Sequence, residues 1–311
     1  MSKLTIVMYH YVRDLRNSAF PRIKGLDISS FRRQMDFLQA EYSFISMEDL
    51  TACIKGSKPL PDNACWLTFD DGYRDHYEFV FPELASRGIE GAFFPPVKPV
   101  AEREILDVNK IHFILACVSD ANVIVEELRS LYLESDLTQS TGKSFDDYCV
   151  DLAKPSRFDS AETIFVKRML QHALPEIWRG RFADFLFGKY VSVDARAFAE
   201  DLYMSPTQLS EMVQAGMYVG GHGYRHIWLN QEKPQAQLEE IEKNLTFLDG
   251  LDSPTDDWVM CYPYGAYNED TLEILKRKGC LVGLTTQVGI ADLQKHPRLE
   301  LPRLDTNDLP Q

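Results

Sequence analysis

Short apolar segments alternate with amphipathic segments along the first hundred residues. Residues 4–9, 64–69 and 91–94 are apolar, and each is followed by polar or turn-forming residues, so each is predicted to be a buried strand. After Ser29 or Ser30, either of which could cap a helix, apolar residues recur at helical spacing. This alternation of strands and helices predicts parallel β/α units.

The pattern changes in the middle of the chain and then returns. Residues 103–204 show helical periodicity without good strand candidates, and their many aromatic and aliphatic residues argue against disorder. Alternation resumes at Ser205 and Pro206, with strands predicted near residues 217–221, 258–262 and 281–285. The sequence therefore predicts a parallel sheet or barrel made of residues 1–102 and 205–311, interrupted by a helical insertion of residues 103–204.

Composition narrows the classes of partner. The chain of 311 residues has 33 Lys and Arg against 47 Asp and Glu, a formal net charge of −14. This charge repels phosphate backbones and anionic lipids, so we expect no nucleic-acid partner. We expect no membrane span, because no stretch approaches about 18 uncharged apolar residues. The N-terminal segment does not resemble a secretory signal and the six cysteines lack CxxC spacing, which predicts a cytoplasmic protein with reduced thiols.

The first candidate motif is Thr68-Phe69-Asp70-Asp71-Gly72, at the end of a predicted strand. Two dehydrated carboxylates side by side raise each other's pKa. A cation bound beside one of them relieves this repulsion and leaves the other free to act as a base. A lone Asp-Asp-Gly is also a common helix cap or turn, so the motif alone does not establish a site.

Two further motifs also follow predicted strands. His222 and His226 have the i, i+4 spacing that can direct two imidazoles at one ion in a helix or tight turn, although two surface histidines in a glycine-rich loop are the commoner case. Pro263 and Gly265 flank Tyr264 and could aim its backbone N–H at a developing oxyanion, although a packed turn explains the same residues. One Asp and two His leave an open coordination position, which is typical of hydrolytic metal sites.

Taken together and in this order, TFDDG, HxxxH and PYG resemble the polysaccharide deacetylase family, also called the NodB-homology or carbohydrate esterase family 4 group. The strand at residues 91–94 fits as well, and the resemblance covers about residues 1–100 and 205–305. It implies an irregular (β/α)7-type barrel. The helical insertion is not explained by the family and is expected to be a scaffold, a homo-oligomer interface or a lid.

The resemblance also implies roles for individual residues. Asp70 would be the general base, and Asp71, His222 and His226 would hold one divalent ion. Zinc is the ion expected, with cobalt, nickel, manganese or iron as alternatives. The backbone of Tyr264 would form part of the oxyanion hole, and a bound substrate would meet the loop at residues 263–264, that is, at Pro263 and Tyr264.

The chain departs from the family pattern at three points. Gly223 stands where the family usually has Ser or Thr, so support for this loop must come from elsewhere. Cys261 stands where an arginine usually steadies the base, and Arg303 is the predicted substitute. Arg225 and Arg298 are the alternative candidates for this role.

The third departure concerns the general acid. A histidine near the C-terminus often supplies it in the family, but His296 lies in a polar stretch that matches poorly. Residues 9–12, Tyr-His-Tyr-Val, resemble the YHxV start of a subgroup in which the N-terminal strand supplies the acid, so His10 is the predicted acid.

These features predict a metal-dependent hydrolase that removes an N-acetyl or other N-acyl group from an amino sugar, a sugar nucleotide or an oligosaccharide, in the synthesis of a surface polysaccharide. Two alternatives remain open. One is a metal-dependent hydrolase of a non-sugar amide, imide or cyclic ureide, with which the altered third motif is compatible. The other is a non-catalytic carbohydrate-binding relative.

Overall fold

The structure is a computed structural model that describes residues 2–156 and 159–310. The chain divides into two compact units. The first comprises Met1–Asp14, Gly25–Glu104 and Ala199–Gln311, and the second comprises Leu15–Lys24 and Ile105–Phe198. Most of the predicted insertion, residues 103–204, thus lies in the second unit. That unit also takes in an N-terminal segment that the periodicity did not single out.

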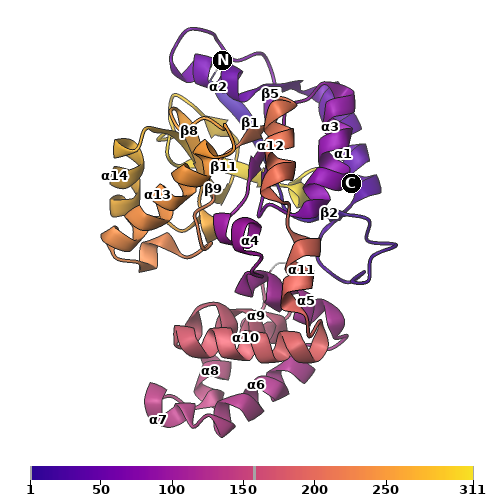
Figure 1. Cartoon of the computed structure of the whole chain (residues 1–311), viewed down its shortest axis with the longest axis vertical. Helices are drawn as coiled ribbons and strands as arrows, with labels where there is room; N and C mark the ends of the chain where they lie inside the picture. Colours follow the sequence, from indigo (N-terminus) through magenta and orange to yellow (C-terminus); the bar gives the residue numbers. More distant parts are fainter. Residues whose placement is uncertain (1, 157–158, 311) are drawn as a thin grey trace. The chain divides into compact units, whose positions relative to one another are not determined.

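The first unit is built on a parallel sheet with the strand order β7-β6-β5-β1-β11-β9-β8 (Figure 1). A parallel bridge between Gly221 and Met260 joins the two ends of this order. The result is the irregular (β/α)7-type barrel that the sequence predicted. The strands are β1 (Lys3–Tyr9), β5 (Ala64–Asp70), β6 (Ala92–Phe94), β7 (Tyr218–Val219), β8 (Trp258–Cys261), β9 (Cys280–Val288) and β11 (Leu301–Asp305).

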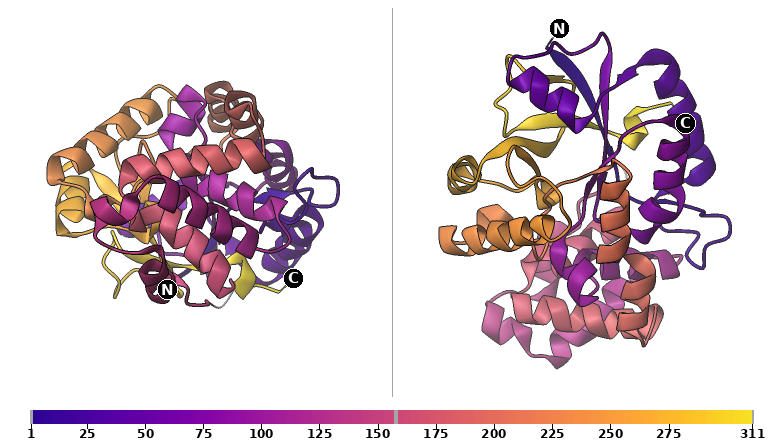
Figure 2. Two further views of the ribbon diagram at one scale, coloured as in Figure 1. Left: turned by 90° about the horizontal axis from the view of Figure 1, so that it is seen from below. Right: turned by 45° about the horizontal axis from the view of Figure 1, so that its top comes forward.

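Shorter strands complete the sheets of this unit. β4 (Ser43–Phe44) pairs with β5, and β10 (Ala291–Asp292) pairs antiparallel with β1, whereas β2 (Val12–Arg13) and β3 (Leu26–Asp27) form a separate pair. The first and last long strands, β1 and β11, are parallel neighbours, seen as indigo and yellow arrows side by side in Figure 2.

Helices connect the strands of the first unit. Most begin at a side-chain cap: Ser46 and Ser205 form capping boxes, and Asn268 caps the helix that follows it. The helices are α1 (Ile28–Glu41), α2 (Met47–Ile54), α3 (Phe81–Arg87), α4 (Val97–Glu102), α11 (Ala195–Leu202, which crosses from the second unit), α12 (Pro206–Gln214), α13 (Pro234–Asp249) and α14 (Glu269–Arg277). A π-helical turn, His76–Val80, precedes α3, and short 3-10 turns lie at Leu229–Gln231, Pro263–Gly265 and Thr306–Asp308.

The barrel core explains why β5 reads as a continuous apolar run. Every residue of β5 is buried, as expected for a strand in the middle of a parallel sheet. Trp66 of β5 packs with Phe94 of β6 and Tyr218 of β7 in a hydrophobic cluster that includes Val259 of β8. Asp70 ends β5, so this rigid core determines where its carboxylate lies.

The second unit is helical, as the periodicity predicted. Its helices are α5 (Asp107–Cys117), α6 (Asn122–Glu134), α7 (Leu137–Thr141), α8 (Phe145–Leu152), α9 (Ala161–Arg168) and α10 (Glu176–Tyr190), with a π-helical turn at Met169–Ala173. α5 packs against α10, and α9 against α6 and α8. Phe20 joins this core from the N-terminal segment, because its ring meets those of Phe113 and Phe198 edge-on.

Over the described residues, no helix combines the length and the apolar character that crossing a membrane requires.

Candidate active site

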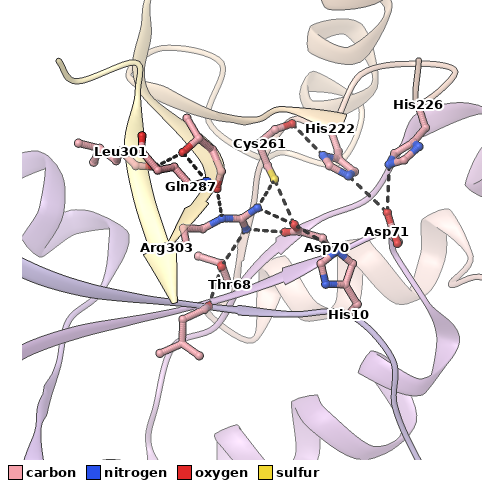
Figure 3. Close-up of polar contacts among 12 residues, drawn as sticks. His10, Thr68, Asp70, Asp71, His222, His226, Cys261, Gln287, Leu301 and Arg303 are labelled. Atoms are coloured by element: carbon pink, nitrogen blue, oxygen red, sulfur yellow. Dashed lines mark hydrogen bonds and ion pairs between the residues drawn. The ribbon is translucent and has the colours of Figure 1, made fainter. Parts of the chain in front are cut away.

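The side chains singled out in the sequence gather where the barrel strands end (Figure 3). Asp70 is the last residue of β5, and His10 follows β1. His222 follows the bridge residue Gly221, and the Pro263–Gly265 turn follows β8. Because the strands are parallel, their carboxyl ends meet at one end of the barrel, where α/β barrels place their active sites.

Asp71, His222 and His226 form a buried cluster around one carboxylate oxygen. The Nε2 atoms of His222 and His226 lie 3.4 Å and 3.3 Å from Oδ1 of Asp71. One candidate ligand atom from each of the three residues lies within 4.8 Å of the others. Two imidazole nitrogens and one carboxylate oxygen are the protein ligands of many hydrolytic metal sites. The three residues therefore fit one divalent ion.

Neighbouring groups orient two members of this cluster, Asp71 and His222. Burial opposes ionisation of Asp71, but hydrogen bonds with the two imidazoles hold the pKa of its carboxyl well below its usual range. The Tyr73 hydroxyl donates a 2.7 Å hydrogen bond to Oδ2 of Asp71, which leaves Oδ1 facing the histidines. Nδ1 of His222 donates to the Cys261 carbonyl at 2.8 Å, so Nε2 is the nitrogen directed at Asp71.

Asp70 has a different partner. The Arg303 guanidinium donates to both of its oxygens, from Nη1 to Oδ1 at 2.9 Å and from Nη2 to Oδ2 at 2.8 Å. Both side chains are buried. Burial raises the pKa of Asp70, but the charge and hydrogen bonds of Arg303 outweigh it and bring the pKa to about 2. Asp70 is therefore an anion held in a fixed orientation by a bidentate pair.

Several groups hold the Arg303 fork in place. Its Nε donates to the Thr285 carbonyl at 3.0 Å, and Nη1 also donates to the Thr68 hydroxyl at 3.1 Å. Nη2 lies 3.2 Å from Sγ of Cys261, the residue that stands where the family usually has arginine. The pairing of β11 with β9 shifts register between Leu301 and Arg303. Such a bulge redirects a side chain, in this case into the barrel.

A second group of possible ligands, Asp70, His222 and Cys261, also lies within reach of a single point. It suits a cation less well, because both oxygens of Asp70 are already bonded to the positive Arg303. Burial also raises the pKa of the Cys261 thiol, which opposes the thiolate form that metals bind. We therefore prefer the cluster of Asp71, His222 and His226.

His10 lies beside Asp70 at the open side of the site. Its Nε2 is 3.8 Å from Oδ2 of Asp70, and its side chain is 42% exposed, so solvent reaches the imidazole. The backbone of His10 is anchored by His76, whose Nε2 lies 2.7 Å from the His10 carbonyl. Burial lowers the pKa of His76 to about 4, so this anchor is a neutral imidazole.

The Pro263–Gly265 turn reaches the same site. Tyr264 has φ 58° and Gly265 φ 67°, so two successive residues adopt the left-handed conformation. The ring of Tyr264 stacks on Trp228 with centroids 4.7 Å apart and meets His226 edge-on at 4.6 Å. Tyr264 is therefore in direct contact with a candidate metal ligand.

The other arginines lie elsewhere. Nε of Arg225 pairs with Glu240 at 2.6 Å, and Nη2 of Arg298 contacts the Ile54 carbonyl at 3.3 Å. All six cysteines are free thiols. Sequence reasoning missed Tyr73 and Glu240, although Tyr73 follows the TFDDG motif directly and could have been noted on that ground.

Part of the chain is similar in sequence to known deacetylases. Residues 181–283 match the sequence model of the family described as polysaccharide deacetylase. The chain is 32% identical over 89 residues to YxkH of Bacillus subtilis (strain 168), a protein assigned to the polysaccharide deacetylases, and 37% identical over 79 residues to the poly-beta-1,6-N-acetyl-D-glucosamine N-deacetylase of Escherichia coli (strain K12). These matches cover 29% and 25% of this chain, and 32% and 12% of those proteins.

Solved structures extend the likeness to nearly the whole chain. The Streptococcus pyogenes deacetylase PplD in complex with acetate matches with a TM-score of 0.58 and 19% identity, covering 97% of this chain and 92% of that chain. IcaB from Ammonifex degensii matches with a TM-score of 0.55 and 17% identity, covering 98% and 92%. At these identities the likeness shows a shared fold. In sequence over part of its length, and in fold over nearly all of it, the chain resembles the polysaccharide deacetylases.

Proposed function

We propose that the protein is a metal-dependent hydrolase that removes an N-acetyl or other N-acyl group from an amino sugar or glycan precursor. One observation carries the proposal. The buried cluster of Asp71, His222 and His226 lies next to a second carboxylate, Asp70, whose two oxygens are both bonded to Arg303 and which Arg303 keeps ionised. A ligand set and a separate base are the two elements that hydrolysis of an unactivated amide requires.

A divalent ion held by this cluster would polarise the acyl carbonyl and lower the pKa of the attacking water. Asp70 would accept the proton of that water. A carboxyl with a pKa near 2 is a weak base, so this role depends on the water being acidified. Tyr264, held by Pro263 and Gly265, would offer its backbone N–H to the oxyanion and with Pro263 would contact the substrate. His10 would protonate the leaving amine.

The substrate class follows from the family and its named relatives. The Escherichia coli relative is named for action on a polymer of N-acetylglucosamine. We propose an N-acetylated amino sugar, presented as a sugar nucleotide or an oligosaccharide, in surface-polysaccharide synthesis. Zinc is the proposed ion, with cobalt, nickel, manganese and iron as alternatives. Arg303 supplies from another strand the arginine that the third motif lacks, so the altered motif gives no reason to prefer a non-sugar amide.

The test is mass spectrometry of N-acetylated amino sugars, sugar nucleotides and oligosaccharides incubated with the metal-loaded protein. We expect loss of an acetyl mass from at least one of them, abolished by a chelator. Asp70→Asn should lower kcat by about 10²- to 10⁴-fold while the ion stays bound. His222→Ala should lose the ion.

Three results would contradict the proposal: no deacetylated product from any of these compounds, a wild-type protein that binds no divalent ion, or an Asp70→Asn variant with wild-type turnover. A wild-type protein that binds the ion and carbohydrate without turnover would support the carbohydrate-binding alternative instead.

A further inference from the structure

The loop that carries His222 and His226 is not a helical turn. Gly223 has φ 72° and His226 has φ 57°, both left-handed. The loop therefore cannot satisfy its own backbone N–H groups in the way a helix does, and buried N–H groups need other acceptors. Gly223 also stands where the family usually has a hydroxyl, so the hydrogen bond expected from that side chain has to be replaced.

The replacement comes from a buried polar stripe on α13. Asn244 accepts the Gly223 N–H at 2.9 Å through Oδ1. Glu240, one turn earlier on the same face, accepts the N–H groups of Tyr224 at 3.0 Å and Arg225 at 2.8 Å, both through Oε2. Three consecutive amides between the two histidines are thus bound by two side chains of one helix.

The charge of Glu240 is balanced within the same contact. Its side chain is 3% exposed, a burial that a carboxylate tolerates only when it is paired and hydrogen-bonded. Nε of Arg225 supplies the opposite charge to Oε1 at 2.6 Å, while Oε2 takes the two amides. Because charge-assisted hydrogen bonds are the stronger kind, Glu240 holds the loop more firmly than a neutral side chain would.

The carbonyl side of the loop is bound as well. The Gly223 carbonyl accepts the N–H of Val97 at 3.1 Å, and the Tyr224 carbonyl accepts that of Lys98 at 2.8 Å. These N–H groups belong to the first turn of α4, which has no partners for them within the helix. α4 thus binds the carbonyl groups of the loop and α13 binds its amides, so both sides of its backbone are held.

We infer that Glu240 and Asn244 are positioning residues that fix the loop so that both imidazoles face Asp71 before any ion binds. The inference rests on the proposed function, because it assigns the cluster of Asp71, His222 and His226 to a metal. It adds that Glu240 and Asn244 of α13 contribute to the affinity for the ion although they contact neither the ion nor the substrate.

The variants that test this are Glu240→Ala, Glu240→Gln and Asn244→Ala, with Glu239→Ala as the matched control. Glu239 is the exposed neighbour on the same helix. The first measurement is the dissociation constant for Zn²⁺ by chelator competition, with the absorption spectrum of the Co²⁺-loaded protein as a report on ligand geometry. The second is hydrogen exchange of residues 221–228 in metal-free protein, which needs neither ion nor substrate.

We expect Glu240→Ala to weaken Zn²⁺ binding by about 10- to 100-fold, to alter the Co²⁺ spectrum and to speed exchange of the loop amides. Glu240→Gln should fall between Glu240→Ala and wild type, because its amide oxygen still accepts two N–H groups but loses the charge that faces Arg225. Asn244→Ala should speed hydrogen exchange at the Gly223 amide alone, because Asn244 accepts no other N–H of the loop. Glu239→Ala should match wild type in every measurement.

The inference is overturned if Glu240→Ala and Asn244→Ala bind Zn²⁺ as wild type does. It is also overturned if they lower the melting temperature while the loop amides exchange no faster. Should Glu240→Ala fail to fold, Glu240→Gln and Asn244→Ala answer the same question. If wild type binds ions but deacetylates nothing, the proposed function fails and the inference stands. If wild type binds no ion, the exchange data still decide whether α13 fixes the loop.

Discussion

At the scale of residues, two adjacent carboxylates have different partners, which suits them to different roles. Asp70 is bonded to a guanidinium, whereas Asp71 faces two imidazoles and a phenol. The left-handed conformation of Asp71, with φ 73°, turns its side chain away from the path of β5. Nearby carboxyl groups in enzymes often take separate roles in this way, each set by its own surroundings.

The pair formed by Asp70 and Arg303 makes a prediction about pH. Arg303 holds the pKa of Asp70 at about 2 against the upward effect of burial. Arg303→Met removes the largest opposing effect, leaving burial against the smaller effects of His10 and His222, so the pKa of Asp70 should rise and the base should become protonated at higher pH. We expect the acid limb of the kcat/KM profile to move to higher pH, and Arg303→Lys, which keeps a charge, to move it less.

Stability provides the control for this variant. Breaking a buried ion pair leaves an uncompensated charge and costs about 3–5 kcal/mol. Since a protonated Asp70 carries no such charge, the stability lost in Arg303→Met should be smaller at low pH than at neutral pH, as measured by urea unfolding. If the acid limb of the kcat/KM profile of Arg303→Met lay at the same pH as in wild type, Asp70 would not be the titrating base.

Tyr73 makes a second prediction at this scale. Its hydroxyl is the donor to Oδ2 of Asp71, and its side chain is fully buried. Tyr73→Phe removes the hydrogen bond to Asp71 and keeps the ring, so Oδ2 of Asp71 is no longer occupied and Oδ1 is no longer the only oxygen open to an ion. We expect Zn²⁺ affinity to fall about 10- to 100-fold. Tyr77→Phe is the control, because Tyr77 bonds to Glu211, away from the cluster. Equal affinities for the two variants would contradict this role.

At the scale of elements, the sequence predicted the long elements well and the irregular ones poorly. Residues 4–9 and 64–69 form strands as expected, since each is a continuous apolar run. α1 begins earlier than expected, because Asp27 and not a serine caps it. β11 was not predicted as a strand: it is short and contains Pro302, and no local pattern reveals the bulge that directs Arg303 inward.

The polar stripe on α13 shows the same limit. Gln237, Glu240 and Asn244 are polar, so in sequence they read as the solvent face of a helix. Their spacing nevertheless places them beside the buried Ile241 and Leu248. A polar residue on an apolar face is the signal that could have identified them. Their partners are backbone N–H groups, which a sequence pattern does not display.

Gly221 yields a prediction for the closure of the barrel. It forms the bridge to Met260, and a Cβ at this position would lie 2.8 Å from Oδ1 of Asn244 and 2.8 Å from Cζ3 of Trp258. Gly221→Ala should therefore displace packed groups, lower stability by about 1–3 kcal/mol and weaken Zn²⁺ binding. Gly180→Ala, with open space around it in α10, should instead stabilise the protein by about 1 kcal/mol. Urea unfolding measures the change in stability of each variant, and chelator competition measures its Zn²⁺ affinity. A Gly221→Ala variant with wild-type stability would contradict the packing argument.

At the scale of the whole molecule, periodicity separated a helical part from a β/α part because the two have different repeat lengths. It could not assign Leu15–Lys24, which has no repeat of its own and joins the helical unit only through tertiary contacts. Arg22, for example, donates from Nε to the Ala116 carbonyl at 2.9 Å. Contacts between residues about a hundred positions apart leave no local trace in a sequence.

Phe20 tests whether this N-terminal segment stabilises the helical unit. Its ring centroid lies 4.9 Å from that of Phe113 and 5.6 Å from that of Phe198, and the side chain is half-buried. Phe20→Ala should cost about 1–2 kcal/mol and speed hydrogen exchange in Ile105–Phe198. Zn²⁺ affinity should not change, because the ligands all belong to the other unit. Phe185→Ala, half-exposed on α10, should change stability by less than about 0.5 kcal/mol. If Phe20→Ala weakened Zn²⁺ binding instead and left exchange of the helices unaltered, the segment would stabilise the barrel and not the helical unit.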